Sequence, residues 1–156
     1  MHPRFADVAN SLHGSFERLL EATPMVAGHR WPKEPVRGVY LFSEGGQHLY
    51  VGRTNHTKRR HGLHCRPSAQ HNQAVFAFKL ARHETGNVKA AYTSGLGSRK
   101  ALAADPMFRL AFDAAKSRVR AMEFRWVEEA DPVKQCLLEV YVAVVLATPF
   151  NDFDNH

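Results

Sequence analysis

Cysteine and long apolar runs are both scarce in this chain of 156 residues. Two cysteines, Cys65 and Cys136, are too few for the disulfide framework of a small secreted domain and suit a reducing compartment. The most apolar run, at 136–147, is too short to span a bilayer and contains Glu139. The first residues have no uninterrupted apolar core of the kind that signal peptides carry. We therefore expect a cytoplasmic protein that does not interact with membranes.

Acidic residues are also in deficit, because 15 of them face 21 lysines and arginines and leave a formal net charge of +6. A surplus of positive charge on a small domain favours a polyanionic partner such as a nucleic acid, although many basic proteins bind nothing acidic. Repeats and low-complexity tracts are absent. The hydrophobic content of 44% is that of a globular protein, and the length fits one domain with one core, with or without an appended element.

Two short segments rich in β-branched and aromatic residues, 37–42 and 48–53, flank a glycine-containing stretch and predict a β-hairpin. Side chains alternate between the faces of a strand, so one face is apolar and the other is aromatic. The apolar face comprises Val39, Leu41, Leu49 and Val51, and the aromatic face comprises Tyr40, Phe42, Tyr50 and Gly52. If the loop is odd-numbered and centred on Gly45, Tyr40 lies directly opposite Tyr50, Leu41 faces Leu49 and Val39 faces Val51.

Apolar periodicity predicts the remaining elements. An amphipathic helix at 4–22 is expected to pack on the domain, with a dimer contact or a DNA-reading arm as alternatives. A proline-rich linker with Trp31 as a possible anchor follows it. Helices are expected at about 57–63, at 70–83 and at about 106–118, and alternation predicts a third strand at 122–127. The Asp131–Pro132 pair begins a last helix, which ends near Ala147.

Glu139 is unusual because apolar residues surround it on nearly every face of the last helix. Such a helix is expected to be buried over most of its circumference. An ionised carboxylate in that position is costly unless it is paired, hydrogen-bonded or bound to a metal. A salt bridge to an arginine, a position at the helix edge that reaches water and a functional role are all compatible with this pattern.

The hairpin resembles the signature of the GIY-YIG nuclease family. Gly38-Val39-Tyr40 stands for the first triplet, with the middle residue changed conservatively, and Tyr50-Val51-Gly52 stands for the second. The family also has an arginine on the helix after the hairpin, which Arg60 matches best, with Arg59 as a fallback. Further matches are Arg53 directly after the second triplet, His64 one turn beyond the arginine, Glu139 as the glutamate of a late helix, and Asn151 soon after that helix.

The resemblance covers about 37–151 and implies an α+β fold, in which helices flank a small three-stranded antiparallel sheet. It divides the chain into an N-terminal helix and linker at 1–35 and a GIY-YIG-like domain at 36–156. The long insertion at 68–118 resembles the helical elaborations of restriction-type members and leaves the substrate specificity open.

The resemblance implies a divalent-metal-dependent endonuclease that hydrolyses DNA, with RNA left open as a substrate. Glu139 is expected to hold a single Mg²⁺ or Mn²⁺, and Arg60 to donate two hydrogen bonds to nonbridging phosphate oxygens. Tyr40 is expected to be the general base, although a free phenol has a pKa of about 10 and needs it lowered. Tyr50 and His64 would orient the water or the base, and Asn151 would bind a phosphate or brace Glu139. The residues expected to bind nucleic acid are Arg53, Lys58, Arg59, Arg99 and Lys100, and both a monomer and a homodimer are compatible with the sequence.

Three other interpretations compete with this one. Several histidines and a cysteine suggest a zinc site, because imidazole and thiolate are zinc ligands, but these residues lack a CxxC or HxxxH spacing and are named at the end of this paragraph. A catalytically inactive nucleic-acid-binding module would use the same basic face and aromatic residues. The glycine-rich basic stretch 94–100 either cradles a phosphate or forms a flexible turn, and its spacing is not that of a P-loop. The candidate zinc ligands are His56, His61, His64, Cys65 and His71.

Overall fold

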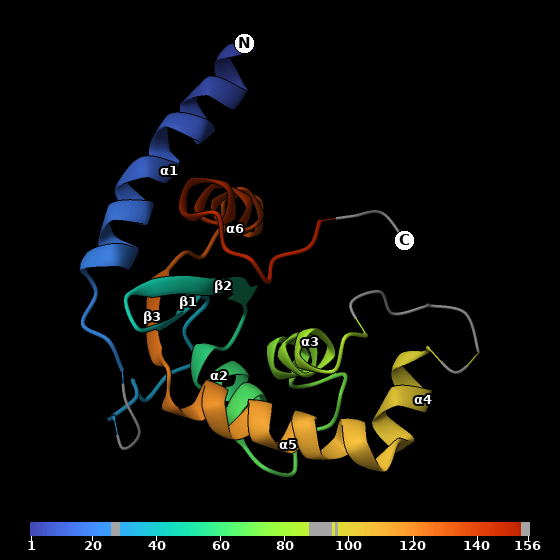
Figure 1. The fold of residues 1–156 in the computed structure, drawn as a ribbon. Helices are drawn as coiled ribbons and strands as arrows, with labels where there is room; N and C mark the ends of the chain where they lie inside the picture. Colours follow the sequence, from blue (N-terminus) through green and yellow to red (C-terminus); the bar gives the residue numbers. More distant parts are fainter. Residues whose placement is uncertain (26–28, 88–94, 96, 154–156) are drawn as a thin grey trace. The chain divides into compact units, whose positions relative to one another are not determined.

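The computed structural model describes residues 1–25, 29–87, 95 and 97–153. It confirms the predicted α+β fold, with a three-stranded antiparallel sheet and six helices among these residues (Figure 1). The chain divides into two compact units. The first comprises residues 1–60 and 122–151, and the second comprises residues 61–121 and 152–156. The predicted boundary near residue 35 stays a prediction.

The sheet of the first unit has the order β2-β1-β3 and is antiparallel throughout. Its strands are β1 (Gly38–Glu44), β2 (Gln47–Thr54) and β3 (Glu123–Glu128), so the two predicted hairpin strands and the third strand are all present. Gly45 and Gly46 connect β1 to β2 with φ angles of 57° and 80°. This left-handed backbone is easy for glycine and produces the two-residue turn that matches the twist of a hairpin.

The predicted hairpin register is wrong by two residues, whereas the predicted faces are correct. Leu41 lies opposite Val51, Phe42 opposite Tyr50 and Tyr40 opposite Gly52. The prediction assumed an odd-numbered loop centred on Gly45. The chain instead makes a two-residue turn and then shifts register between Phe42 and Ser43, which is a β-bulge. A shift of two residues keeps every side chain on its face, so the apolar and aromatic faces survive.

Helices α1 (Pro3–Glu21) and α6 (Pro132–Leu146) pack with the apolar face of this sheet (Figure 1). Asp131 begins α6 as its N-cap, because its carboxylate accepts hydrogen bonds from the backbone N–H groups of Val133 and Lys134 at 2.8 and 2.9 Å. Helix α1 contributes Leu12, Phe16 and Leu19 to a core that it shares with the sheet and α6, so the predicted packing of the N-terminal helix on the domain is confirmed. The shared core contains Leu12, Phe16, Leu19, Val39, Leu41, Val51, Val127, Leu138, Val142 and Ala143.

The prediction that α6 is buried over most of its circumference is wrong. Its packed side carries Leu138, Val142 and Ala143, whereas Val133 and Val144 on another side are 60% and 70% exposed. Val140 and Val145 are exposed as well, so the apolar sequence of this helix does not imply burial on every side. No helix in the described ranges is both long and apolar enough to cross a membrane.

The second unit is built on helices α3 (Val75–Glu84), α4 (Arg99–Ala104) and α5 (Pro106–Ala121). Helix α2 (Thr57–Cys65) begins in the first unit and ends in the second. The predicted start of α3 at residue 70 is wrong by five residues. A turn occupies that stretch, because Gln73 Oε1 accepts a hydrogen bond from Gln70 N at 3.1 Å and Gln73 N donates to Gln70 O at 2.9 Å. The ring of Phe78 on α3 packs against Phe108 and Phe112 of α5.

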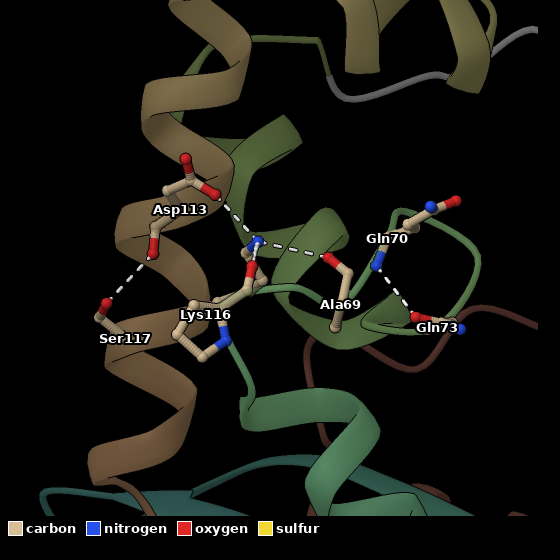
Figure 2. Close-up of polar contacts among 7 residues, drawn as sticks. Ala69, Gln70, Gln73, Asp113, Lys116 and Ser117 are labelled. Carbon is tan, nitrogen blue, oxygen red and sulfur yellow. Dashed lines mark hydrogen bonds and ion pairs between the residues drawn. The ribbon is translucent and has the colours of Figure 1, made fainter.

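Lys116 joins the 67–70 segment to α5 within this unit (Figure 2). Its ammonium group donates to the carbonyls of Pro67 and Ala69 and pairs with Asp113 at 2.9 Å. An ammonium group has three N–H donors, so these partners account for its full donor capacity. Lys116 is 5% exposed, which is tolerated because the charge is paired and hydrogen-bonded.

Candidate active site

Tyr40 lies in the middle strand of the sheet, directly over a glycine of the edge strand. A Cβ atom on Gly52 would lie 2.5 Å from Cζ of Tyr40, so a larger residue at position 52 would displace the ring. On the neighbouring strand, Phe124 stacks on Tyr40 with a centroid separation of 5.5 Å and an interplanar angle of 24°. The glycine and the phenylalanine together hold the buried phenol in one position.

Three of the predicted site residues meet at this phenol. Nε of Arg60 on α2 donates a hydrogen bond to the hydroxyl oxygen of Tyr40 at 3.1 Å. Tyr50 on β2 is also hydrogen-bonded to Tyr40, and their rings are 6.4 Å apart. The two phenols are therefore neighbours, although they do not occupy opposite positions in the strand pairing as the predicted register required.

Glu139 on α6 lies close enough to act electrostatically on both phenols. Its carboxylate raises the pKa of Tyr40 and of Tyr50. Its side chain is 21% exposed, so it is not enclosed by hydrocarbon as the composition of the last helix suggested. Its Oε2 accepts a hydrogen bond from Nε of Arg53 at 3.0 Å. Both features belong to the alternatives that the sequence left open, namely an arginine partner and a position at the helix edge.

Burial decides the protonation of the two phenols. It raises the pKa of Tyr40, and the guanidinium of Arg60 lowers that pKa only in part. Burial likewise raises the pKa of Tyr50, and the neighbouring Tyr40 raises it further. Both hydroxyl groups are consequently protonated near neutral pH, because even an unperturbed phenol titrates at a pKa of about 10.

Asn151 is engaged by the backbone of the edge strand β2. Its Oδ1 accepts from Val51 N at 2.9 Å, and its Nδ2 donates to Val51 O at 2.8 Å. The hydroxyl of Thr148 donates to the same Oδ1 at 2.9 Å. The amide thus pairs with the strand as a backbone peptide would, between Tyr50 and Gly52 in sequence. This contact suits a residue that positions β2, whereas the predicted contact was with a phosphate or with Glu139.

The remaining predicted site residues are distributed over both units. Lys58 and Arg59 are exposed on the first turn of α2, and Arg53 is exposed at the end of β2. His64 lies one turn after Arg60 on the same helix, is buried and belongs to the second unit. Arg99 and Lys100 are in the second unit as well. The guanidinium of Arg99 donates to His71 O at 2.7 Å and covers the ring of Phe78, so this residue has a structural role there.

The predicted glycine-rich loop at 94–100 is described only in part, because residues 94 and 96 lie outside the described residues. Ser98 is the N-cap of α4 and its hydroxyl oxygen accepts from Ala101 N at 3.1 Å. Both basic residues of the stretch are therefore in a short helix instead of a loop.

The donor set can be compared with what a divalent cation needs. Within the described ranges, no three histidine, cysteine, aspartate or glutamate side chains gather to form a protein cage for a metal. Mg²⁺ commonly binds to one or two carboxylates and completes its shell with water and substrate phosphates. Glu139 fits that mode, since it borders an open pocket of about 340 Å³ that is also lined by Arg53, Thr54, Asn55 and Gln135. The site therefore suits a cation that binds together with a phosphate.

Two of the candidate zinc ligands lie next to each other on α2. Sγ of Cys65 and Nε2 of His61 are 3.5 Å apart, which places two potential ligands side by side. Burial raises the pKa of the Cys65 thiol to about 12 and lowers the pKa of His61. A cysteine binds zinc as a thiolate, and in the described ranges no third histidine, cysteine, aspartate or glutamate joins this pair in a group that could hold a metal.

The sequence did not predict two features of the site, namely the packing of Phe124 on Tyr40 and the choice of Arg53 as the partner of Glu139. Phe124 fixes the Tyr40 ring, and its only sequence signal is the alternation of the third strand. The pairing of Arg53 with Glu139 joins residues 86 positions apart, and neither residue carries a local signal for the other.

Comparison of the chain with protein-family models, with curated proteins and with solved structures found no match.

Proposed function

We propose that this protein is a divalent-metal-dependent endonuclease that hydrolyses DNA phosphodiester bonds. The observation that supports the proposal most is the convergence at Tyr40. Arg60 donates to its hydroxyl, Tyr50 is hydrogen-bonded to it, and Glu139 acts on its pKa. These four residues come from β1, β2, α2 and α6, and they are among the residues that the resemblance to GIY-YIG nucleases singles out.

Each residue has a role in this proposal. A Mg²⁺ or Mn²⁺ ion held by Glu139 would neutralise charge at the phosphorus, stabilise the leaving 3′ oxygen and lower the pKa of Tyr40. Arg60 binds nonbridging phosphate oxygens through its planar fork, while it orients the Tyr40 hydroxyl. Tyr50 holds Tyr40 in place, and Tyr40 accepts the proton of the attacking water. His64 belongs to the second unit and is buried, so the proposal gives it no part in the reaction.

The raised pKa of Tyr40 constrains the proposed base. A protonated phenol cannot remove a proton from water, and Arg60 by itself does not offset the effect of burial. General-base catalysis by Tyr40 therefore requires further positive charge at the site. Arg53, Lys58 and Arg59 are exposed and are proposed to bind the phosphates of the DNA on both sides of the bond that is cleaved.

A catalytically inactive nucleic-acid-binding module is the second candidate. Two observations favour it: the proposed metal ligand is paired with Arg53, and the proposed base is protonated. Plasmid DNA, single-stranded DNA and RNA, each incubated with Mg²⁺ or with a chelator, separate the two candidates. We expect Mg²⁺-dependent cleavage of DNA. Binding without cleavage of any of the three would establish the inactive module instead.

The variant Glu139→Gln tests the assigned metal ligand. It preserves the shape of the side chain and removes its charge, so we expect cleavage to fall by at least about 100-fold while DNA affinity is retained. Cleavage rates and filter-binding affinities measure the two effects. The matched control is Glu84→Gln in the second unit, where Glu84 pairs with Arg118 at 3.2 Å. Equal loss of cleavage in both variants, or full activity in Glu139→Gln, would contradict the assignment.

A further inference from the structure

The ion pair between Arg53 and Glu139 occupies the carboxylate that the proposed function assigns to the metal. Nε of Arg53 lies 3.0 Å from Oε2 of Glu139. A divalent cation at this carboxylate would lie within a few ångströms of a positive guanidinium, and like charges at that distance repel. Arg53 therefore opposes cation binding for as long as it stays on Glu139.

Arg53 is placed so that it can exchange this partner for another. Its side chain is 48% exposed, so the contact is an open surface pair of the kind that contributes little stability. Beside it lies the open pocket of about 340 Å³, whose other walls are the polar side chains of Thr54, Asn55, Gln135 and Glu139. A guanidinium can bind a phosphate group through two parallel hydrogen bonds. Its hydrogen bond to Glu139 joins Nε to one carboxylate oxygen, so a phosphate is the stronger partner for Arg53.

We infer that Arg53 is an electrostatic gate that keeps Glu139 from binding a divalent cation until a phosphodiester anion attracts Arg53 away. The inference rests on the proposed function for the cation at Glu139 and for the identity of the anion. Once Arg53 has moved to a phosphate, its charge no longer opposes a cation at Glu139, and the added anion attracts the cation. Cation and nucleic acid then bind cooperatively, and each tightens the binding of the other by the same factor.

Titration of the protein with Mn²⁺ in the absence of nucleic acid tests the gate directly, with free Mn²⁺ counted by electron paramagnetic resonance. Arg53→Gln removes the opposing charge and leaves Glu139 in place. We expect it to bind Mn²⁺ at least about tenfold more tightly than the wild type does, a factor that corresponds to about 1.4 kcal/mol. Adding Glu139→Gln to this variant should abolish the gain. Equal Mn²⁺ affinity of Arg53→Gln and the wild type would overturn the inference.

Arg118→Gln is the matched control. It also breaks an Arg–Glu pair and frees a carboxylate, that of Glu84, whose side chain is 43% exposed. No gain in Mn²⁺ affinity is expected from it, because Glu84 has no part in the proposed metal site. Arg53→Ala provides a second variant with the same expected gain, and circular dichroism verifies that each variant is folded. A gain as large in Arg118→Gln as in Arg53→Gln would reduce the effect to net charge and overturn the gate.

A second titration includes a short single-stranded oligodeoxynucleotide, with the Glu139→Gln protein as the blank. The oligonucleotide should tighten Mn²⁺ binding by the wild type more than that of Arg53→Gln, because its phosphates attract the cation in both proteins but displace Arg53 only in the wild type. A wild type that does not respond would overturn the cooperative part of the inference. The proposed function can fail separately: absent cleavage together with tighter Mn²⁺ binding by Arg53→Gln would refute the nuclease and retain the gate.

Discussion

Arg60 connects the helix after the hairpin to the phenol of the middle strand. Its Nε donates to Tyr40, so the same guanidinium that is proposed to bind phosphate also sets the position of the proposed base. A lysine at this position retains a positive charge, but it has no planar fork with which to contact two oxygens at once. Comparing alanine with lysine at position 60 therefore separates the contribution of positive charge to catalysis from that of the paired donors.

We predict that Arg60→Ala lowers kcat for DNA cleavage by about 10²–10³-fold, as the loss of one transition-state donor typically does. Arg60→Lys should recover little of this loss, because it supplies charge without the paired donors. Steady-state cleavage of a labelled DNA measures kcat and KM separately. A wild-type kcat for Arg60→Lys would show that charge alone suffices and would contradict the assigned role.

Single residues also explain why the two triplets of the hairpin contain glycine. A Cβ atom on Gly52 would collide with the Tyr40 ring, and a Cβ atom on Gly38 would collide with the Val127 carbonyl of the neighbouring strand. Close approach of a ring and of a backbone accounts for both glycines in this chain. The sequence showed where the glycines are, and the strand pairing shows what they accommodate.

At the scale of elements, local patterns predicted the helices and strands well, apart from α4, which was not predicted, and the beginning of α3. The Asp131–Pro132 pair begins α6 and Pro106 begins α5, as their capping chemistry indicates. The start of α3 was missed because the side chain of Gln73 stabilises a turn at a stretch with helix-compatible composition. The hairpin register was missed because a bulge is not visible in an alternating pattern.

Lys116 offers a test of how α5 holds the 67–70 segment in the second unit. Lys116→Met keeps much of the side-chain length but removes the donors to Pro67 and Ala69 and the pair with Asp113. We predict a loss of about 2–3 kcal/mol in the free energy of unfolding, typical of hydrogen bonds to a charged group. Urea unfolding followed by circular dichroism measures it. The control is Lys100→Met on the exposed side of α4, and equal stability of the two variants would contradict the role of Lys116.

At the scale of the whole molecule, the buried phenols make stability depend on alkaline pH. Tyr40 and Tyr50 have pKa values above that of an unfolded tyrosine, which is about 10. Above about pH 10 the unfolded chain therefore binds fewer protons than the folded protein, and stability decreases as pH rises. The Cys65 thiol, whose pKa is raised to about 12, acts in the same direction from about pH 9 upward.

We predict that the urea midpoint decreases between about pH 8 and about pH 11, and that Tyr50→Phe reduces this decrease because it removes one titrating group. Each phenol contributes at most about 1.4 kcal/mol for every pH unit between its unfolded and folded pKa. Urea unfolding at the two pH values measures the effect, with Tyr141→Phe on α6 as a control at a half-buried position. An alkaline decrease that is identical in Tyr50→Phe and the wild type would refute the linkage.

The sequence alone determined the order of the elements other than α4 and the two faces of the hairpin, and the resemblance to GIY-YIG nucleases supplied the set of polar residues proposed for the site. The elements and the two faces depend on short-range periodicity and capping, which a chain displays locally. Tertiary structure decided how the strands align, that Glu139 pairs with Arg53, and that Asn151 binds the backbone of Val51. The last two contacts join residues 86 and 100 positions apart, and only the packing of α6 and the following segment against the edge strand brings them together.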